Sequence, residues 1–185
     1  FKGAKLLVVD PRRIKMTQFA DSWLRPKLGT DVAWINGMMN VIIAEDLYDK
    51  AFVETRTEDF DALKQTVQKY TPDHVEEITG IPGDQLADAA RLFAGARAGS
   101  ILYCMGITQH VSGTDNVKSL ANLAMLCGHM GKEGGGVNPL RGQNNVQGAC
   151  DMGGLPNVFT AYQPVTSDDA RQKREAAWGV TGTSD

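Results

Sequence analysis

The stretch Ala4–Asp10, with the sequence AKLLVVD, constrains the fold more than any other part of the chain. It is an apolar run of strand length that ends in an acid, and Pro11 follows at once. Such a run is typical of a strand buried on both faces. Because proline has no amide hydrogen to donate, it does not continue the ladder. The pattern therefore predicts a buried strand with a carboxylate at its C-terminal tip.

Helical patterns and two further extended segments follow this strand. Apolar residues recur at helical spacing, with capping residues, glycine or proline at several of the ends. We expect extended segments at Asp21–Leu24 and Ser100–Cys104, and we expect the second of these to be buried. We expect helices at Asp31–Glu45, Phe60–Tyr70 and Pro72–Ile78, a further helix from Pro82 onward, and a last one at Thr114–Cys127. This order of strands and helices predicts an α/β fold with a Rossmann-like parallel sheet flanked by helices.

Composition narrows the functional classes. The chain has 185 residues, of which 42% are hydrophobic, so it can build a core. Its 19 basic and 22 acidic residues give a net charge of −3, which argues against nucleic acid as a partner. The sequence contains no apolar run of the ~20 residues that cross a bilayer, so we expect no direct membrane insertion.

The amino-acid composition of the sequence changes near its C-terminal end. Glycine is dense in Gly131–Gly136 and Gly142–Gly154, and the tail from Thr166 is polar. We therefore expect an α/β domain over residues 1–140, and over residues 141–185 a loop with the start of a neighbouring domain or a surface excursion. Because the chain begins with Phe1 and enters a strand almost at once, we expect it to be an internal piece of a larger subunit.

Ligands of open α/β sheets bind beyond the carboxyl ends of the strands. Asp10 and Arg12 lie at such an end. A carboxylate can accept hydrogen bonds from both hydroxyls of a ribose, and an arginine can neutralise a phosphate. The alternative is a solvated turn that contains a salt bridge.

A second candidate is Met105–His110, which follows the next strand and leads into a helix near Gly113. Backbone amides at a helix start can hold an anion. His110 is either a catalytic group or an ordinary satisfied histidine.

A third candidate is the polar segment Asn138–Gly148. Four amide side chains and Arg141 fall within seven residues, and burying such a cluster is costly unless it meets a polar ligand. The planar fork of Arg141 suits a small carboxylate. The alternative is a polar loop that caps the next helix.

Several common sites are excluded by the motifs. The sequence holds no Walker A motif, and no GxGxxG follows the first strand. Its three cysteines, Cys104, Cys127 and Cys150, form no CxxC pair, so we expect no metal ligands within this chain.

Five segments together resemble the molybdenum- or tungsten-dependent formate dehydrogenases, a branch of the bis-pterin (molybdopterin) oxidoreductases. The segments are Gly3–Arg12 (GAKLLVVDPR), Leu28–Asp31 (LGTD), Ile43–Lys50 (IAEDLYDK), Met105–Gln109 (MGITQ) and Val137–Gly153 (VNPLRGQNNVQGACDMG). The last is the most specific to the formate branch. The resemblance identifies the chain as an internal fragment of a catalytic (alpha) subunit.

The resemblance implies a role for individual residues. Asp10 resembles the acid that holds the ribose of a molybdopterin guanine dinucleotide, with Arg12 beside it. Asp31 resembles the acid that reads the guanine edge. Arg141 resembles the arginine that orients formate. Residues implied to line the pterin are Met105, Gly106 and Gln109, and weaker candidates for cofactor or active-site contacts are Gln143 and Asn145.

The resemblance also implies a reaction and its partners. Formate would be oxidised to carbon dioxide, and two electrons would pass through molybdenum or tungsten to a 4Fe–4S cluster. The cluster cysteines and the cysteine or selenocysteine metal ligand belong to other segments of the same subunit. Electron-transfer subunits are expected as partners. We expect this piece alone to be inactive. Alternatives are another bis-pterin oxidoreductase and a non-catalytic module that binds guanine nucleotides. The family occurs in bacterial and archaeal cytoplasm and periplasm, and the sequence does not select between them.

Overall fold

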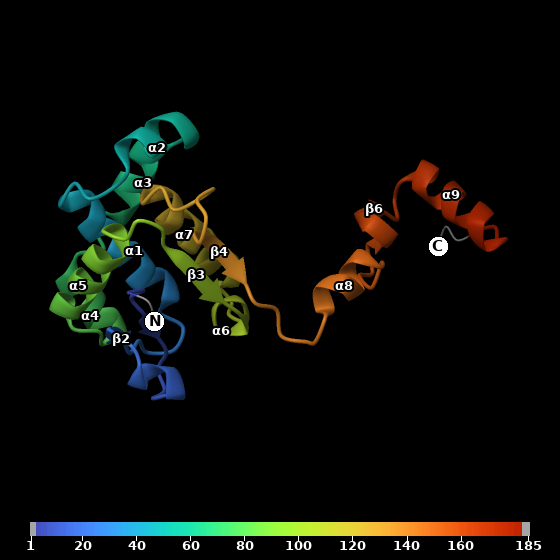
Figure 1. The fold of residues 1–185 in the computed structure, drawn as a ribbon. Coiled ribbons are helices and arrows are strands. Elements are labelled where there is room, and N and C mark those ends of the chain that lie inside the picture. Colours follow the sequence, from blue (N-terminus) through green and yellow to red (C-terminus); the bar gives the residue numbers. More distant parts are fainter. Residues whose placement is uncertain (1–2, 183–185) are drawn as a thin grey trace. The chain divides into compact units, whose positions relative to one another are not determined.

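The computed structural model describes residues 3–182 of the chain, and Figure 1 shows their fold. The chain divides into two compact units between Leu140 and Arg141. Residues 1–140 form the first unit and residues 141–185 the second, and each is described by itself below.

The strands of the first unit pair in parallel. β1 (Leu7–Val9) lies beside β2 (Ser22–Leu24), and β3 (Ser100–Tyr103) lies beside β4 (Gly136–Pro139). The predicted α/β class and the parallel pairing are therefore confirmed. Within the described residues, these strands form two separate two-stranded pairs.

The prediction that the strand at Ser100–Cys104 is buried is wrong. Burial alternates along β3, and the side chain of Leu102 is 63% exposed. Ile101 and Tyr103 pack against the core, whereas Leu102 points to the opposite face. An apolar run without alternation suggests burial on both faces, but only one face of this strand is covered.

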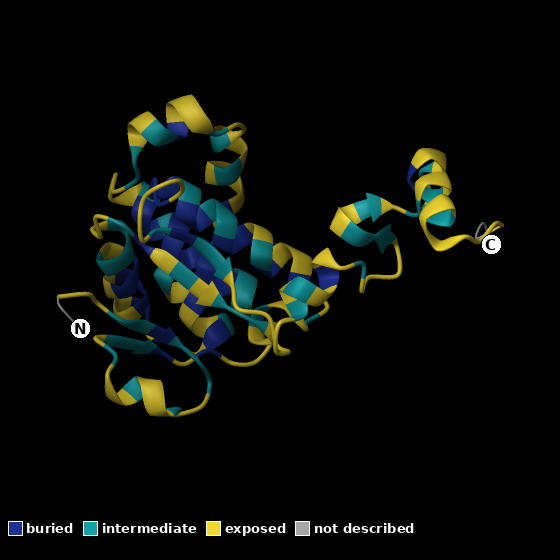
Figure 2. Cartoon of the chain, turned by 45° about the vertical axis from the view of Figure 1, so that its right-hand side comes forward, coloured by how far each residue is buried: buried dark blue, intermediate teal, exposed yellow. Residues whose placement is uncertain are grey.

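α1 (Asp31–Ala44) is the centre of the first unit. It packs against α3 (Phe60–Val67), α4 (Pro72–Thr79), α5 (Gly83–Ala94) and α7 (Gly113–Leu126). Figure 2 shows the buried residues gathered along these helices. The largest fully buried side chains of the unit are those of Leu24, Ile35, Met38, Met39, Ile42, Val67, Val75, Ile81, Leu86, Asn116, Leu126 and His129.

Gly37 explains how closely the helices approach α1. A Cβ at this position would lie 2.8 Å from both Leu86 Cδ2 and Val75 Cγ2, so a larger residue would require these side chains to move. Gly80 ends α4 in the left-handed region, with φ of 75°, as the sequence pattern predicts.

Shorter elements complete the first unit. They are a 3-10 helix at Lys15–Gln18, α2 at Lys50–Arg56 and α6 at Met105–Thr108. Residues 3–182 contain no helix that is both long and apolar enough to cross a membrane.

The helices and strands of the second unit bury few side chains. It contains α8 (Val146–Asp151), the antiparallel pair β5 (Val158–Phe159) and β6 (Gln163–Pro164), a 3-10 helix at Thr160–Tyr162, and α9 (Asp168–Trp178). Among its described residues, only Cys150 and Ala170 are buried.

Candidate functional site

Asp10 lies where predicted, directly after β1. Its Oδ1 accepts a hydrogen bond from the backbone N–H of Arg12 at 2.7 Å, and the Arg12 Nε lies 3.6 Å from the same oxygen. Its backbone carbonyl accepts from Trp23 Nε1 at 2.9 Å. The carboxylate is thus held through one oxygen, and Oδ2 makes no hydrogen bond to the described residues.

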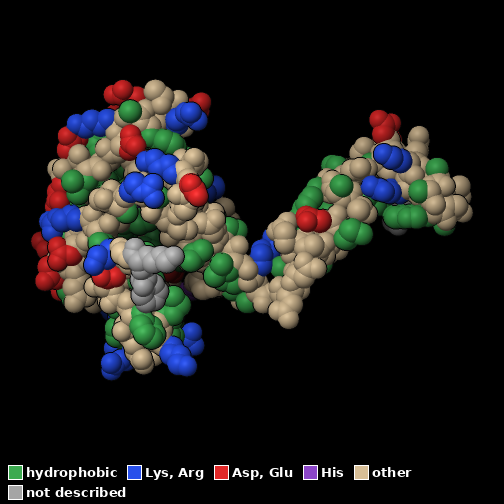
Figure 3. All heavy atoms as spheres, viewed as in Figure 1, with side chains coloured by type: hydrophobic (Ala, Val, Ile, Leu, Met, Phe, Trp, Pro, Cys, Tyr) green, Lys and Arg blue, Asp and Glu red, His purple; other side chains and the backbone are tan. Residues whose placement is uncertain are grey.

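Basic side chains surround this turn. The side chain of Arg12 is 80% exposed, and Arg13 and Lys15 are exposed next to it. Figure 3 shows lysine and arginine side chains at the lower end of the unit, where Figure 1 places the 3-10 helix that follows β1. The turn after β1 therefore combines one fixed carboxylate with a positive surface suited to an anion.

Asp31 is the first residue of α1, and its side chain is only 15% exposed. Its contacts are long, because Trp34 Nε1 donates to Oδ1 at 3.4 Å and His110 Nε2 lies 3.8 Å from Oδ2. The positive end of the α1 dipole favours a carboxylate there. Asp31 is therefore a largely buried acid that retains capacity to accept further hydrogen bonds.

His110 connects this acid to the segment that follows β3. Its Nε2 lies 2.9 Å from the carbonyl oxygen of Gly106, which can only accept, so this nitrogen carries the proton. The structure thus places Asp31 next to the Met105–His110 segment. Sequence reasoning assigned the two to separate sites and did not identify His110 as their link.

Met105 and Gly106 begin α6, and Gln109 is the capping residue that follows its last residue. All three are exposed, and a Cβ on Gly106 would meet no atom within 4 Å. Asn116 of α7 fixes this segment in place. Its side chain is fully buried and donates from Nδ2 to the carbonyl of Ile107 at 2.8 Å. Sequence reasoning missed Asn116, although an asparagine on the apolar face of a helix is a signal of a buried polar tie.

Arg141 lies in the second unit, in the left-handed region with φ of 59°. Its Nη1 donates to Gln147 Oε1 at 3.3 Å, and its Nη2 donates to Cys150 Sγ at 3.1 Å. Both partners lie on α8. The contacts of the guanidinium are therefore with Gln147 and Cys150, two residues that sequence reasoning did not single out.

Gln143 and Asn145 are exposed and shape the start of α8. The carbonyl of Gln143 accepts from the Val146 N–H at 3.4 Å, and Asn145 takes a left-handed conformation at the helix start. Gly148 leaves space for the Asn145 side chain, because a Cβ there would lie 2.6 Å from its Oδ1. The structure leaves the roles predicted for Gln143 and Asn145 as predictions.

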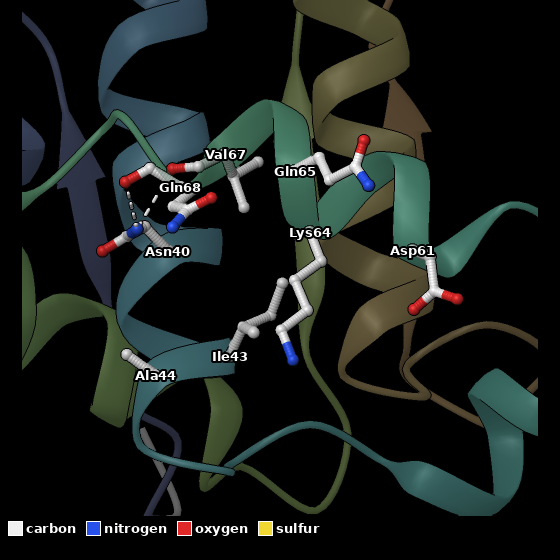
Figure 4. Close-up of a pocket in the computed structure, with 8 residues that line it drawn as sticks. All are labelled: Asn40, Ile43, Ala44, Asp61, Lys64, Gln65, Val67 and Gln68. Carbon is white, nitrogen blue, oxygen red and sulfur yellow. Dashed lines mark hydrogen bonds between the residues drawn. The ribbon is translucent and has the colours of Figure 1, made fainter.

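A hollow of about 400 Å³ lies between α1 and α3, and none of the candidate site residues lines it. Figure 4 shows its lining, with Lys64 extending toward Ile43. Asn40 donates from Nδ2 to the carbonyls of Val67 at 3.0 Å and Gln68 at 3.3 Å, so its amide ties the two helices together. We interpret the hollow as a surface groove between packed helices.

Residues 3–182 bring together no group of three or more His, Cys, Asp or Glu side chains that could hold a metal ion. Apart from Met105 and Gly106, the candidate residues are acids, amides and arginines. Such groups recognise polar organic ligands through hydrogen bonds and charge.

Comparisons with known proteins agree with the motifs. The family model described as Molybdopterin oxidoreductase matches residues 1–182. The chain is 52% identical over 177 residues to the F420-dependent formate dehydrogenase subunit alpha of Methanocaldococcus jannaschii, covering 96% of this chain and 26% of that protein. It is 50% identical over 178 residues to formate dehydrogenase H of Escherichia coli, covering 96% and 25%. The chain thus spans about a quarter of the length of these relatives.

Among solved structures, acetylene hydratase from Pelobacter acetylenicus matches with a TM-score of 0.69 and 39% identity. The match covers 70% of this chain and 18% of that one. Together, the comparisons confirm the resemblance predicted from the sequence segments.

Proposed function

The chain belongs to the molybdopterin oxidoreductase family, and from this premise we propose that it is part of the catalytic subunit of a formate dehydrogenase. The observation that carries the proposal is about 50% identity, over nearly the whole chain, to proteins named formate dehydrogenase. Because the chain spans a quarter of those proteins, we assign the activity to a full subunit and expect this piece alone not to oxidise formate.

The residues present fit a molybdopterin guanine dinucleotide. Asp31 is a largely buried carboxylate with only long contacts, which suits the N1 and N2 donors of guanine. In the proposal, Asp10 accepts from the ribose hydroxyls and Arg12 faces phosphate. The residues assigned to the pterin are the exposed Met105, Gly106 and Gln109. When bound with molybdenum or tungsten, this group supplies the redox chemistry.

Arg141 is proposed to bind the substrate. Its guanidinium is always charged and offers paired donors to the two oxygens of formate. In the full subunit, formate would lose a proton and two electrons and become carbon dioxide, and the bound metal–pterin group and a 4Fe–4S cluster would supply the redox chemistry that accepts those electrons. The contribution of Arg141 is to orient the carboxylate. Gln143 and Asn145 are assigned to polar contacts with cofactor or substrate.

The test is Arg141→Lys in the full-length subunit. Lysine keeps the charge but loses the planar fork, so we expect kcat/KM for formate to fall about 100-fold, the usual scale for one oriented polar contact. Molybdenum or tungsten and pterin contents should stay unchanged. Arg171→Lys in α9 is the matched control and should retain activity. A wild-type kcat/KM in Arg141→Lys would contradict the substrate role.

One alternative stays open because the chain also resembles acetylene hydratase, whose name describes a different reaction, so the fold by itself does not specify formate as the substrate. The alternative is another bis-pterin enzyme that acts on a different small acid or oxyanion. Substrate profiling of the full-length subunit separates the two. A non-catalytic guanine-nucleotide module would instead bind GDP and contain neither metal nor pterin. Elemental and pterin analysis of the full-length protein distinguishes this alternative from the enzyme.

A further inference from the structure

Arg141 is held against one face of α8. Nη1 donates to Gln147 at 3.3 Å, and Nη2 donates to the sulfur of Cys150 at 3.1 Å. Gln147 and Cys150 are three residues apart, so their side chains share a helix face. Because two different nitrogens of the guanidinium are engaged, its orientation is restrained as well as its position.

The amide of Gln147 has only one favourable orientation. Its Nε2 donates to Asp151 Oδ1 at 3.2 Å and lies 3.0 Å from the hydroxyl of Tyr162. An ionised carboxylate can only accept, so the NH₂ group must face Asp151. The reversed amide would place its oxygen against the carboxylate and its NH₂ against the guanidinium. Asp151 therefore determines that Gln147 presents its oxygen to Arg141.

Tyr162 closes the same network from outside the helix. Ala161 and Tyr162 both have positive φ, of 60° and 56°, and this turn brings the phenol to Gln147. Burial of the phenol, together with the Asp151 carboxylate, raises the pKa of Tyr162. The phenol oxygen accepts a hydrogen bond from the Gln147 amide at 3.0 Å.

We propose that Gln147 is a positioning residue, which sets the direction of the Arg141 guanidinium for the formate carboxylate while Asp151 and Tyr162 set the direction of Gln147. This rests on the proposed function, in which Arg141 binds formate. Gln147 acts through Arg141 and makes no contact with the substrate itself. Its loss leaves the positive charge in place but removes the contact that orients it.

The experiment uses the full-length, metal-loaded subunit with Gln147→Met. Methionine keeps the length of the side chain and removes the amide. We expect KM for formate to rise about tenfold, as for loss of one hydrogen bond to a charged group, with a smaller change in kcat and an unchanged metal content. Gln172→Met, on an exposed position of α9, makes the same substitution as a control and should leave KM unchanged.

A double-mutant cycle separates positioning from a merely structural role. If Gln147 acts through Arg141, adding Gln147→Met to Arg141→Lys causes no further loss of kcat/KM. Losses that multiply in full would overturn the proposal, as would a wild-type KM in Gln147→Met. In both cases an impaired Arg141→Lys leaves the proposed function standing. A wild-type Arg141→Lys would instead remove the proposed function, and the positioning role with it.

A second variant covers the case in which Gln147→Met fails to fold. Gln147→Glu keeps the shape; one carboxylate oxygen pairs with the guanidinium and competes with formate, and the other replaces the NH₂ group that faces Asp151. We expect KM to rise more than tenfold, at an unchanged metal content. A wild-type KM for this variant contradicts the proposal.

Discussion

The two units of the chain are stabilised in different ways. In residues 1–140, α1 is buried along most of its length by helices on several sides. In the described part of residues 141–185, two residues are buried, and α8 and α9 depend on caps and side-chain hydrogen bonds. The difference teaches that the acids proposed to bind cofactor sit on a packed framework. The arginine proposed to bind substrate is held by polar contacts instead. Each of these contacts contributes little to stability, but together they orient the guanidinium.

Matched methionine substitutions give the largest expected contrast between the units. Met38 is 1% exposed in the first unit, and Met152 is 74% exposed in the second. Met38→Ala should lower the free energy of unfolding of residues 1–140 by about 2–5 kcal/mol, because it leaves a cavity. Met152→Ala should change the stability of its unit by less than ~0.5 kcal/mol. Native-state hydrogen exchange measures both. Similar losses at the two sites would contradict the comparison.

Helix caps give an intermediate contrast. Ser167 accepts from the Ala170 N–H of α9 and Thr71 from the His74 N–H of α4, both at 3.4 Å. Replacing either by alanine should cost about 1 kcal/mol. Packing against α1 and α5 should keep α4 protected, whereas α9 should lose most of its protection. Hydrogen exchange of peptides from the two helices is the measurement, and equal protection after both substitutions would contradict the expectation.

Surface charge gives the smallest effect. Arg91 donates to both oxygens of Glu45, at 2.6 and 2.9 Å, and this hydrogen bonding and charge lower the pKa of Glu45. The stabilisation is therefore present at neutral pH and is lost as pH falls through the depressed pKa. Both side chains are more than a third exposed, so solvent screens the pair.

Glu45→Gln tests this pair. The wild type should have a slightly higher melting temperature than the variant at pH 7, and the difference should be lost as pH falls through the depressed pKa of Glu45 and shrink in high salt. A difference that does not change with pH would show that the pair contributes nothing through charge.

Local signals predicted much of the first unit and less of the second. The spacing of Ile35, Met39 and Ile42 predicted α1, and Gly80 predicted the end of α4. α9 escaped prediction because it lacks an apolar face. Its capping signals, Ser167 at the start and Gly179 at the end, were nevertheless present.

The sequence predicted where the candidate residues lie along the strands and helices, but not which other residues they contact. The sequence placed Asp10 after a strand and Asp31 at a helix start, and the structure has them there. The contact of Asp31 with His110 joins segments that are 79 positions apart, and it depends on tertiary packing. The contact of Tyr162 with Gln147 depends on positive φ at two non-glycine residues, which sequence patterns do not signal.

The left-handed backbone of Arg141 has a consequence for engineering and for evolution. A residue with a Cβ pays about 1–2 kcal/mol for this conformation, a cost that glycine avoids and that asparagine reduces. A library of variants selected only for heat resistance would therefore be drawn toward glycine or asparagine at position 141. Under the proposed substrate role, retention of arginine there reflects selection on turnover, so the residue at this position records which of the two pressures a lineage has experienced.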